Sequence, residues 1–234
     1  MAHALDKIYE SEAAWKGPEV AASSDWIYRL TEDDVAEIDT ALAHVKSKRM
    51  ALSQFGRSDF PLPTLSKTLA GILTELETGR GFKLIRGIPV MRYSEEDATL
   101  VYWGLMSYFG ESMAQNMMGE LISHVRAIEG DWNQDFNIRG YQTTVHLPFH
   151  CDKADLVGLM CLQTSKAGGT SCISSAVAIH NQILRTRPDL LAALYEEFYI
   201  DHRGEEFEGE PPYYISPVFA IHKGHFFSRF GSKY

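Results

Sequence analysis

The sequence predicts an α+β fold, because two kinds of hydrophobic pattern divide the chain. Apolar residues recur at helical spacing through the first half, whereas short runs of strand-like composition follow from about Met117. The chain has 234 residues, of which 45% are hydrophobic, and it can therefore bury a substantial core. We see no internal repeat or linker, so we expect a single domain over residues 1–234.

Three helices and a strand are expected in the first half. Thr31 is followed by three acidic residues, which is typical of a helix start, and apolar residues at helical spacing continue to about residue 48. A second, leucine-rich stripe predicts a helix over residues 62–79. Residues 81–89 combine apolar residues with bounding Gly and Pro, which indicates a short strand. Ser94 can cap a third helix that ends at Gly110.

The second half is expected to be rich in β-structure. Its apolar runs predict strands over 121–128, 142–145 and 156–163, helices over 175–184 and 188–198, and a hairpin made by 213–221 and 225–230. Lys223 and Gly224 are the expected turn of that hairpin.

The net charge and the cysteine content indicate which binding partners and which cellular compartment to expect. The 31 acidic residues outnumber the 22 basic ones, for a net charge of -9, which argues against nucleic acid or an anionic membrane as a partner. Acidic residues near the N-terminus do not suit a secretory signal, and the apolar window at residues 100–109 is too short to cross a bilayer. We expect a cytoplasmic protein with reduced, buried thiols at Cys151, Cys161 and Cys172.

The clearest chemical signal is the run Phe149-His150-Cys151-Asp152. In an extended chain, residues i and i+2 project from the same face, so His150 and Asp152 can offer a nitrogen and an oxygen to one metal ion. Such a pair fits two positions of a 2-His-1-carboxylate site. A His-x-acid pair is expected about once by chance in this composition, so a plain His–Asp hydrogen bond is the alternative.

The motif lies within an ordered set of segments, namely residues 81–89, 109–116, 121–126, 147–163, 167–175 and 178–182. Together they resemble the taurine-dioxygenase-like (TauD/TfdA) family, over roughly residues 60–234. The resemblance implies a double-stranded β-helix (jelly roll) over about residues 116–234, preceded by N-terminal helices over about residues 1–115. It also implies a dioxygenase that uses Fe(II), 2-oxoglutarate and O2 to oxidise, most simply hydroxylate, a small organic substrate with release of succinate and carbon dioxide.

The resemblance also assigns roles to individual residues. His150 and Asp152 correspond to the first two iron ligands and are therefore the expected catalytic pair. Ser171, or Thr170 as second choice, corresponds to the hydroxyl residue that contacts a carboxylate of 2-oxoglutarate. Three further polar residues correspond to positions that line the substrate cavity: Gln115, Asn116 and His146.

Two residues that the family requires are not evident. Relatives take a third iron ligand, a distal His, from a late strand and place an Arg beyond it for 2-oxoglutarate. We therefore expect the chain to stop inside the barrel, as part of a longer protein or as a truncated, inactive homologue. A less favoured alternative uses His222 or His225 as the ligand and Arg229 as the anchor. An open strand edge would favour a partner strand or a homo-oligomer.

Two rival functions use the same residues differently. A non-catalytic jelly-roll protein would keep the fold and bind a small molecule or a partner chain. A zinc-dependent hydrolase would use the His150–Asp152 pair without 2-oxoglutarate. The oxygenase alone needs both Ser171 and a downstream Arg, and this requirement separates the three hypotheses.

Overall fold

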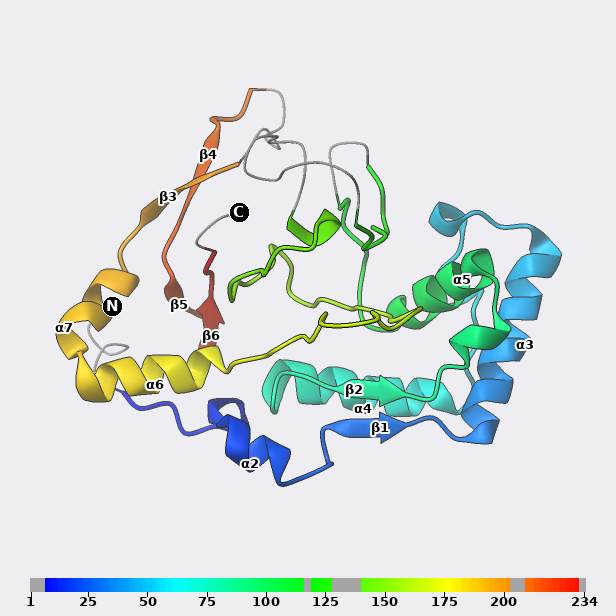
Figure 1. Cartoon of the computed structure of the whole chain (residues 1–234), viewed down its shortest axis with the longest axis horizontal. Coiled ribbons are helices and arrows are strands. Elements are labelled where there is room, and N and C mark those ends of the chain that lie inside the picture. Colours follow the sequence, from blue (N-terminus) through cyan, green and yellow to red (C-terminus); the bar gives the residue numbers. More distant parts are fainter. Residues whose placement is uncertain (1–6, 116–118, 128–139, 203–208, 232–234) are drawn as a thin grey trace. The chain divides into compact units, whose positions relative to one another are not determined.

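The computed structural model describes residues 7–115, 119–127, 140–202 and 209–231 (Figure 1). The chain divides into two compact units. We call Tyr9–Ser112 with Leu156–Ile179 the helical unit, and Met1–Ile8 with Met113–Asp155 and His180–Tyr234 the strand unit. That the whole chain is one domain stays a prediction.

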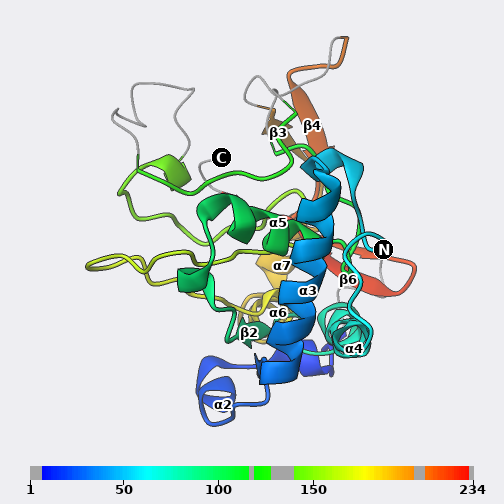
Figure 2. The ribbon, with the colours of Figure 1, turned by 90° about the vertical axis from the view of Figure 1, so that its right-hand side faces the viewer.

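Three helices build the core of the helical unit: α3 (Glu32–Lys48), α4 (Leu65–Thr78) and α5 (Glu95–Met106). Figure 2 shows α3 upright, with α4 seen end-on beside it. Their apolar faces meet around fully buried Ile38, Leu65 and Val101, and fully buried Phe60 belongs to the same cluster. All three helices were predicted from apolar spacing, and the structure confirms them.

Each of these helices begins at an identifiable cap. Thr31 accepts a hydrogen bond from the Asp34 amide at 3.1 Å, and Asp34 accepts one from the Thr31 amide at 2.8 Å. Ser94 caps α5 by accepting a hydrogen bond from the Asp97 amide at 3.0 Å. The amides at the start of α4 donate instead to the carboxylate of Glu37, at 3.0 Å from the Leu65 nitrogen. A side chain of α3 therefore caps α4.

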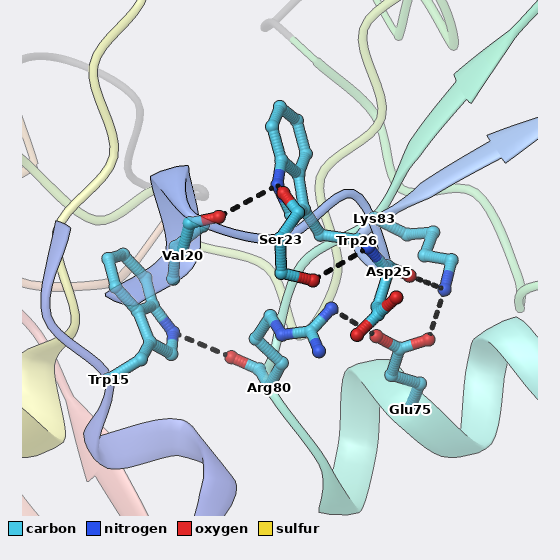
Figure 3. A network of polar contacts seen from close by, with 8 residues as sticks. All are labelled: Trp15, Val20, Ser23, Asp25, Trp26, Glu75, Arg80 and Lys83. Carbon is cyan, nitrogen blue, oxygen red and sulfur yellow. Dashed lines mark hydrogen bonds and ion pairs between the residues drawn. The ribbon is translucent and has the colours of Figure 1, made fainter. Parts of the chain in front are cut away.

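Residues 15–26 are held against the C-terminal end of α4 by the polar network in Figure 3. Glu75 of α4 pairs with Arg80 at 3.1 Å and with Lys83 at 2.5 Å, and Lys83 also donates to the Asp25 carbonyl. Trp15 donates its indole N–H to the Arg80 carbonyl at 2.9 Å. This network joins 3-10 helix η1 (Glu12–Ala14) and α2 (Gly17–Ala21) to the parallel strand pair β1 (Ile27–Arg29) and β2 (Leu84–Arg86).

The described residues of the strand unit form two antiparallel pairs. β3 (Phe198–Asp201) pairs with β4 (Tyr213–Ser216), and β5 (Phe219–His222) pairs with β6 (His225–Ser228). Lys223 and Gly224 join β5 to β6 with φ angles of 50° and 85°, as a two-residue hairpin turn requires. The predicted turn is therefore confirmed.

A small aromatic core lies beside these strands. His180 of α6 (Ala176–Thr186) is fully buried, and its ring contacts Tyr195, Phe219 and Phe226. Its Nε2 atom lies 3.0 Å from the Tyr195 hydroxyl. Burial lowers the pKa of His180, although the hydrogen bond with Asn181 opposes the shift. The neutral imidazole is therefore the form that suits this core.

Some predicted elements differ in the structure. Residues 121–127, 142–145 and 156–163 form no strand, because strand composition does not by itself supply a neighbouring edge with which to pair. The helix predicted over 188–198 is α7 (Pro188–Leu194) and ends early, because Phe198 begins β3 and pairs with Ser216. The run 213–221 is divided into β4 and β5 around Pro217, which lacks the N–H that a ladder needs.

The remaining short elements are 3-10 helices: η2 (Leu52–Gln54), η3 (Val90–Arg92) and η4 (Gly140–Gln142). Helices and small sheets occur together, as in the predicted α+β class, and no closed barrel forms within the described ranges. No helix in those ranges is long and apolar enough to span a membrane.

All three cysteines are free, but Cys161 and Cys172 are exposed, so the prediction of buried thiols was wrong for both. Both lie in described segments that form neither helix nor strand.

Candidate active site

The structure brings the two predicted metal ligands together in the strand unit. The Nε2 atom of His150 lies 3.6 Å from Oδ1 of Asp152, with the imidazole 25% and the carboxylate 53% exposed. The other ring nitrogen, Nδ1, lies 2.8 Å from the Pro148 carbonyl oxygen. A proton on Nδ1 donates to that carbonyl and leaves the Nε2 lone pair directed toward the carboxylate side. This is the orientation that a metal-binding histidine needs.

The pair fits two positions around one ion. Ligand atoms 3.6 Å apart can both reach a metal at about 2.1 Å, the usual distance for imidazole nitrogen and carboxylate oxygen. Within the described ranges, however, no group of three His, Cys, Asp or Glu side chains lies close enough to hold an ion. Neither His222 nor His225 therefore completes a three-ligand group there, and that alternative gains no support. The described residues provide two of the three expected ligands.

Residues 149–152 form no strand, but their backbone is attached to the end of the β5–β6 hairpin. The Cys151 amide donates to the Phe230 carbonyl at 2.7 Å, and the Arg229 guanidinium donates to the Cys151 carbonyl. Arg229 also donates to the Tyr214 hydroxyl. Arg229 was predicted only as an alternative anchor for 2-oxoglutarate, and no signal in the sequence indicated its contact with Cys151.

The predicted 2-oxoglutarate residues lie in the helical unit. Thr170 and Ser171 are exposed and follow Gly168 and Gly169, whose φ angles of 72° and 68° make the expected turn. The Ser165 hydroxyl closes this turn by donating to the Gly168 carbonyl at 2.7 Å. Contact of Ser171 or Thr170 with the cosubstrate stays a prediction.

The three predicted substrate residues belong to the segment that leads toward His150. Gln115 is exposed and its side-chain amide donates to the Met113 carbonyl at 2.9 Å. His146 is exposed four residues before His150. Asn116 lies outside the described residues. Their role in lining a substrate cavity stays a prediction.

Comparisons with known proteins add independent information about this chain. The family described as "Taurine catabolism dioxygenase TauD, TfdA family" matches residues 46–234. FR-33289 synthase of Streptomyces rubellomurinus is 32% identical over 230 residues, which cover 98% of this chain and 68% of that protein. Taurine hydroxylase-like protein SAT17 of Stachybotrys chartarum is 30% identical over 219 residues, which cover 91% of this chain and 56% of that protein.

The chain thus spans about two thirds of the first relative and little more than half of the second. The family match covers residues 46–234 and therefore includes all of the predicted site residues, namely His150, Asp152, Thr170, Ser171, Gln115, Asn116 and His146. With a match over well beyond half of its length, the chain belongs to the TauD/TfdA family of dioxygenases.

Proposed function

We propose that this protein is an Fe(II)- and 2-oxoglutarate-dependent dioxygenase that hydroxylates a small organic substrate and releases succinate and carbon dioxide. The observation that carries the proposal is the geometry of His150 and Asp152, 3.6 Å apart, within a chain of the TauD/TfdA family. The name of one relative, taurine hydroxylase-like protein, favours hydroxylation among the oxidations open to such an enzyme.

The chain's own residues would bind and orient the reactants. Nε2 of His150 and Oδ1 of Asp152 would hold the ferrous ion, and the Pro148 carbonyl would keep the imidazole in the correct tautomer. When bound, iron and 2-oxoglutarate supply the oxidising chemistry. The hydroxyl of Ser171, or of Thr170, would donate to a carboxylate oxygen of 2-oxoglutarate.

The scaffold and the partners are parts of the same proposal. A jelly roll over about residues 116–234 would surround the metal pair and exclude water from it. Gln115, Asn116 and His146 would line the substrate side of this cavity. A third protein ligand is required in addition to the described pair. We expect a small-molecule substrate and neither nucleic acid nor a membrane as a partner, with a homo-oligomer as one way to cover an open strand edge.

A non-catalytic binding protein on the same fold is the second candidate. One observation favours it: no three-ligand group occurs in the part of the chain that the structure describes. Such a protein would bind its ligand without consuming 2-oxoglutarate.

Succinate formation separates the two candidates. We expect 2-oxoglutarate-dependent succinate release that is lost in His150→Ala and in Asp152→Ala, while the fold is retained. His44→Ala, which removes an exposed histidine on α3, is the matched control and should leave the rate unchanged. Equal succinate release in wild type and His150→Ala would exclude this pair as the site.

A further inference from the structure

The residue between the two proposed ligands is held through both of its backbone polar groups. The Cys151 amide donates to the Phe230 carbonyl at 2.7 Å, and the Cys151 carbonyl accepts from Nη1 of Arg229. Because the peptide groups of Cys151 connect it to His150 and Asp152, fixing them also fixes the directions in which both ligand side chains leave the backbone. We call residues 150–152 the ligand segment. Arg229 and Phe230, which directly follow β6, therefore hold its backbone in place.

Arg229 is itself held in place from two directions. Its amide donates to the Val218 carbonyl at 2.8 Å, which extends the pairing of β5 with β6. Its Nε and Nη2 atoms donate to the Tyr214 hydroxyl on β4 at 3.1 and 2.9 Å. The planar guanidinium can direct donors to a hydroxyl on one side and a carbonyl on the other, which a lysine ammonium on a flexible stem does less well. The half-buried position of Arg229 limits competition from water.

Tyr214 also contacts Lys153, the residue that follows the ligand segment. The Lys153 ammonium, one residue beyond Asp152, lies 4.7 Å from the centre of the Tyr214 ring. Tyr214 is therefore linked to the segment through Arg229 at Cys151 and through its ring at Lys153. The segment has support on both sides of Asp152.

We propose that Arg229, oriented by Tyr214, is a positioning residue that sets the geometry of the His150–Asp152 pair and thereby its affinity for a divalent metal. The inference rests on the proposed function, because it assigns a purpose to the support of that pair. Arg229 acts through the Cys151 carbonyl and does not bind the metal. Groups that orient metal ligands in this way typically change metal affinity by about 10- to 100-fold when removed.

The test compares Arg229→Gln, Arg229→Lys and Tyr214→Phe with wild type, using two measurements on the full chain. The first is hydrogen exchange of the Cys151 amide in metal-free protein. The second is the Kd for Co(II), which serves as the divalent probe. Arg185→Gln, an exposed arginine near the end of α6, is the matched control and should change neither measurement.

We expect Arg229→Gln to exchange the Cys151 amide faster and to bind Co(II) about 10- to 100-fold more weakly. Arg229→Lys should restore part of the affinity, since its ammonium can reach only one of the two acceptors. Tyr214→Phe keeps the ring and loses the hydroxyl, so it should give a smaller change in the same direction. The double variant Arg229→Gln/Tyr214→Phe should be no worse than Arg229→Gln alone, because Tyr214 acts through Arg229.

Unchanged amide exchange and unchanged Kd in folded Arg229→Gln would overturn the inference. If that variant does not fold, Tyr214→Phe decides in the same way. His150→Ala separates failure of the proposed function from failure of the role given to Arg229. Co(II) affinity that does not depend on His150 refutes the proposed function, and with it the effect of Arg229 on metal binding. Affinity that depends on His150 but not on Arg229 refutes the inference alone.

Discussion

Replacing Gly104 by alanine tests how closely α5 packs in the core of the helical unit. A Cβ atom at this position would lie 2.4 Å from Cγ and Cδ2 of Phe60. Non-bonded carbon atoms normally lie at least about 3.5 Å apart, so the Phe60 ring would have to move away by roughly 1 Å. Phe60 is fully buried, and its carbonyl accepts a hydrogen bond from Tyr108 at 2.8 Å. The ring therefore cannot move without disturbing its neighbours.

The expected magnitude follows from two opposing effects. Overpacking a core costs about 1–3 kcal/mol, and a displacement of this size belongs near the upper end. Alanine gains about 1 kcal/mol over glycine inside a helix, which leaves Gly104→Ala destabilised by about 2 kcal/mol. Gly71→Ala in α4 is the matched control, because no atom lies within 4 Å of its Cβ, and it should be more stable than wild type.

Urea unfolding followed by circular dichroism measures both variants. We expect the free energies of unfolding of Gly71→Ala and Gly104→Ala to differ by about 3 kcal/mol. In a Phe60→Ala background, Gly104→Ala should cost less than in wild type, because alanine lacks the Cγ and Cδ atoms that the new Cβ would meet. Equal stability of the two glycine variants would refute the close packing of α5 against Phe60.

Three further changes test other contacts. Glu37→Ala removes the cap of α4 and should cost about 1–2 kcal/mol in urea unfolding, while Glu37→Gln, which keeps an acceptor, costs less. Glu75→Gln loses charge attraction to two partly buried cations and should cost about 1–2 kcal/mol, a difference that shrinks in about 1 M salt; no loss at low salt would contradict the network. Burial lowers the pKa of His180, so below about pH 6.5 the unfolded chain binds more protons and Tm should fall as pH decreases. His180→Gln should flatten this dependence, and an unchanged slope would exclude His180 as its source.

Local signals predicted the elements that depend on neighbours in the sequence. Thr31 and Ser94 mark their helix starts because a cap needs only the three residues that follow it. Lys223-Gly224 marks the hairpin turn because few residues adopt positive φ easily. The spacing of His150 and Asp152 was likewise sufficient to predict that the two side chains lie near each other.

Contacts between distant residues could not be predicted in this way. Glu37 caps a helix that begins 28 residues later, and Arg229 supports a peptide 78 residues earlier. Residues 156–163 alternate between half-buried and exposed with the period of a strand, yet they pair with no strand in the described ranges. Their inward face meets α5, where the Gly158 carbonyl accepts from the Tyr102 hydroxyl at 2.7 Å. Periodicity identifies the inward side of such a segment and does not reveal what covers it.

The most direct test of the central claim is anaerobic titration of the purified protein with Fe(II) and 2-oxoglutarate, observed in the visible range. We expect the weak charge-transfer band of the iron–2-oxoglutarate chelate in wild type and its loss in His150→Ala and Asp152→Ala. His44→Ala should keep the band. A band of equal strength in wild type and in both site variants would contradict the assignment of iron to His150 and Asp152. The absence of a band in wild type would favour the non-catalytic binding protein.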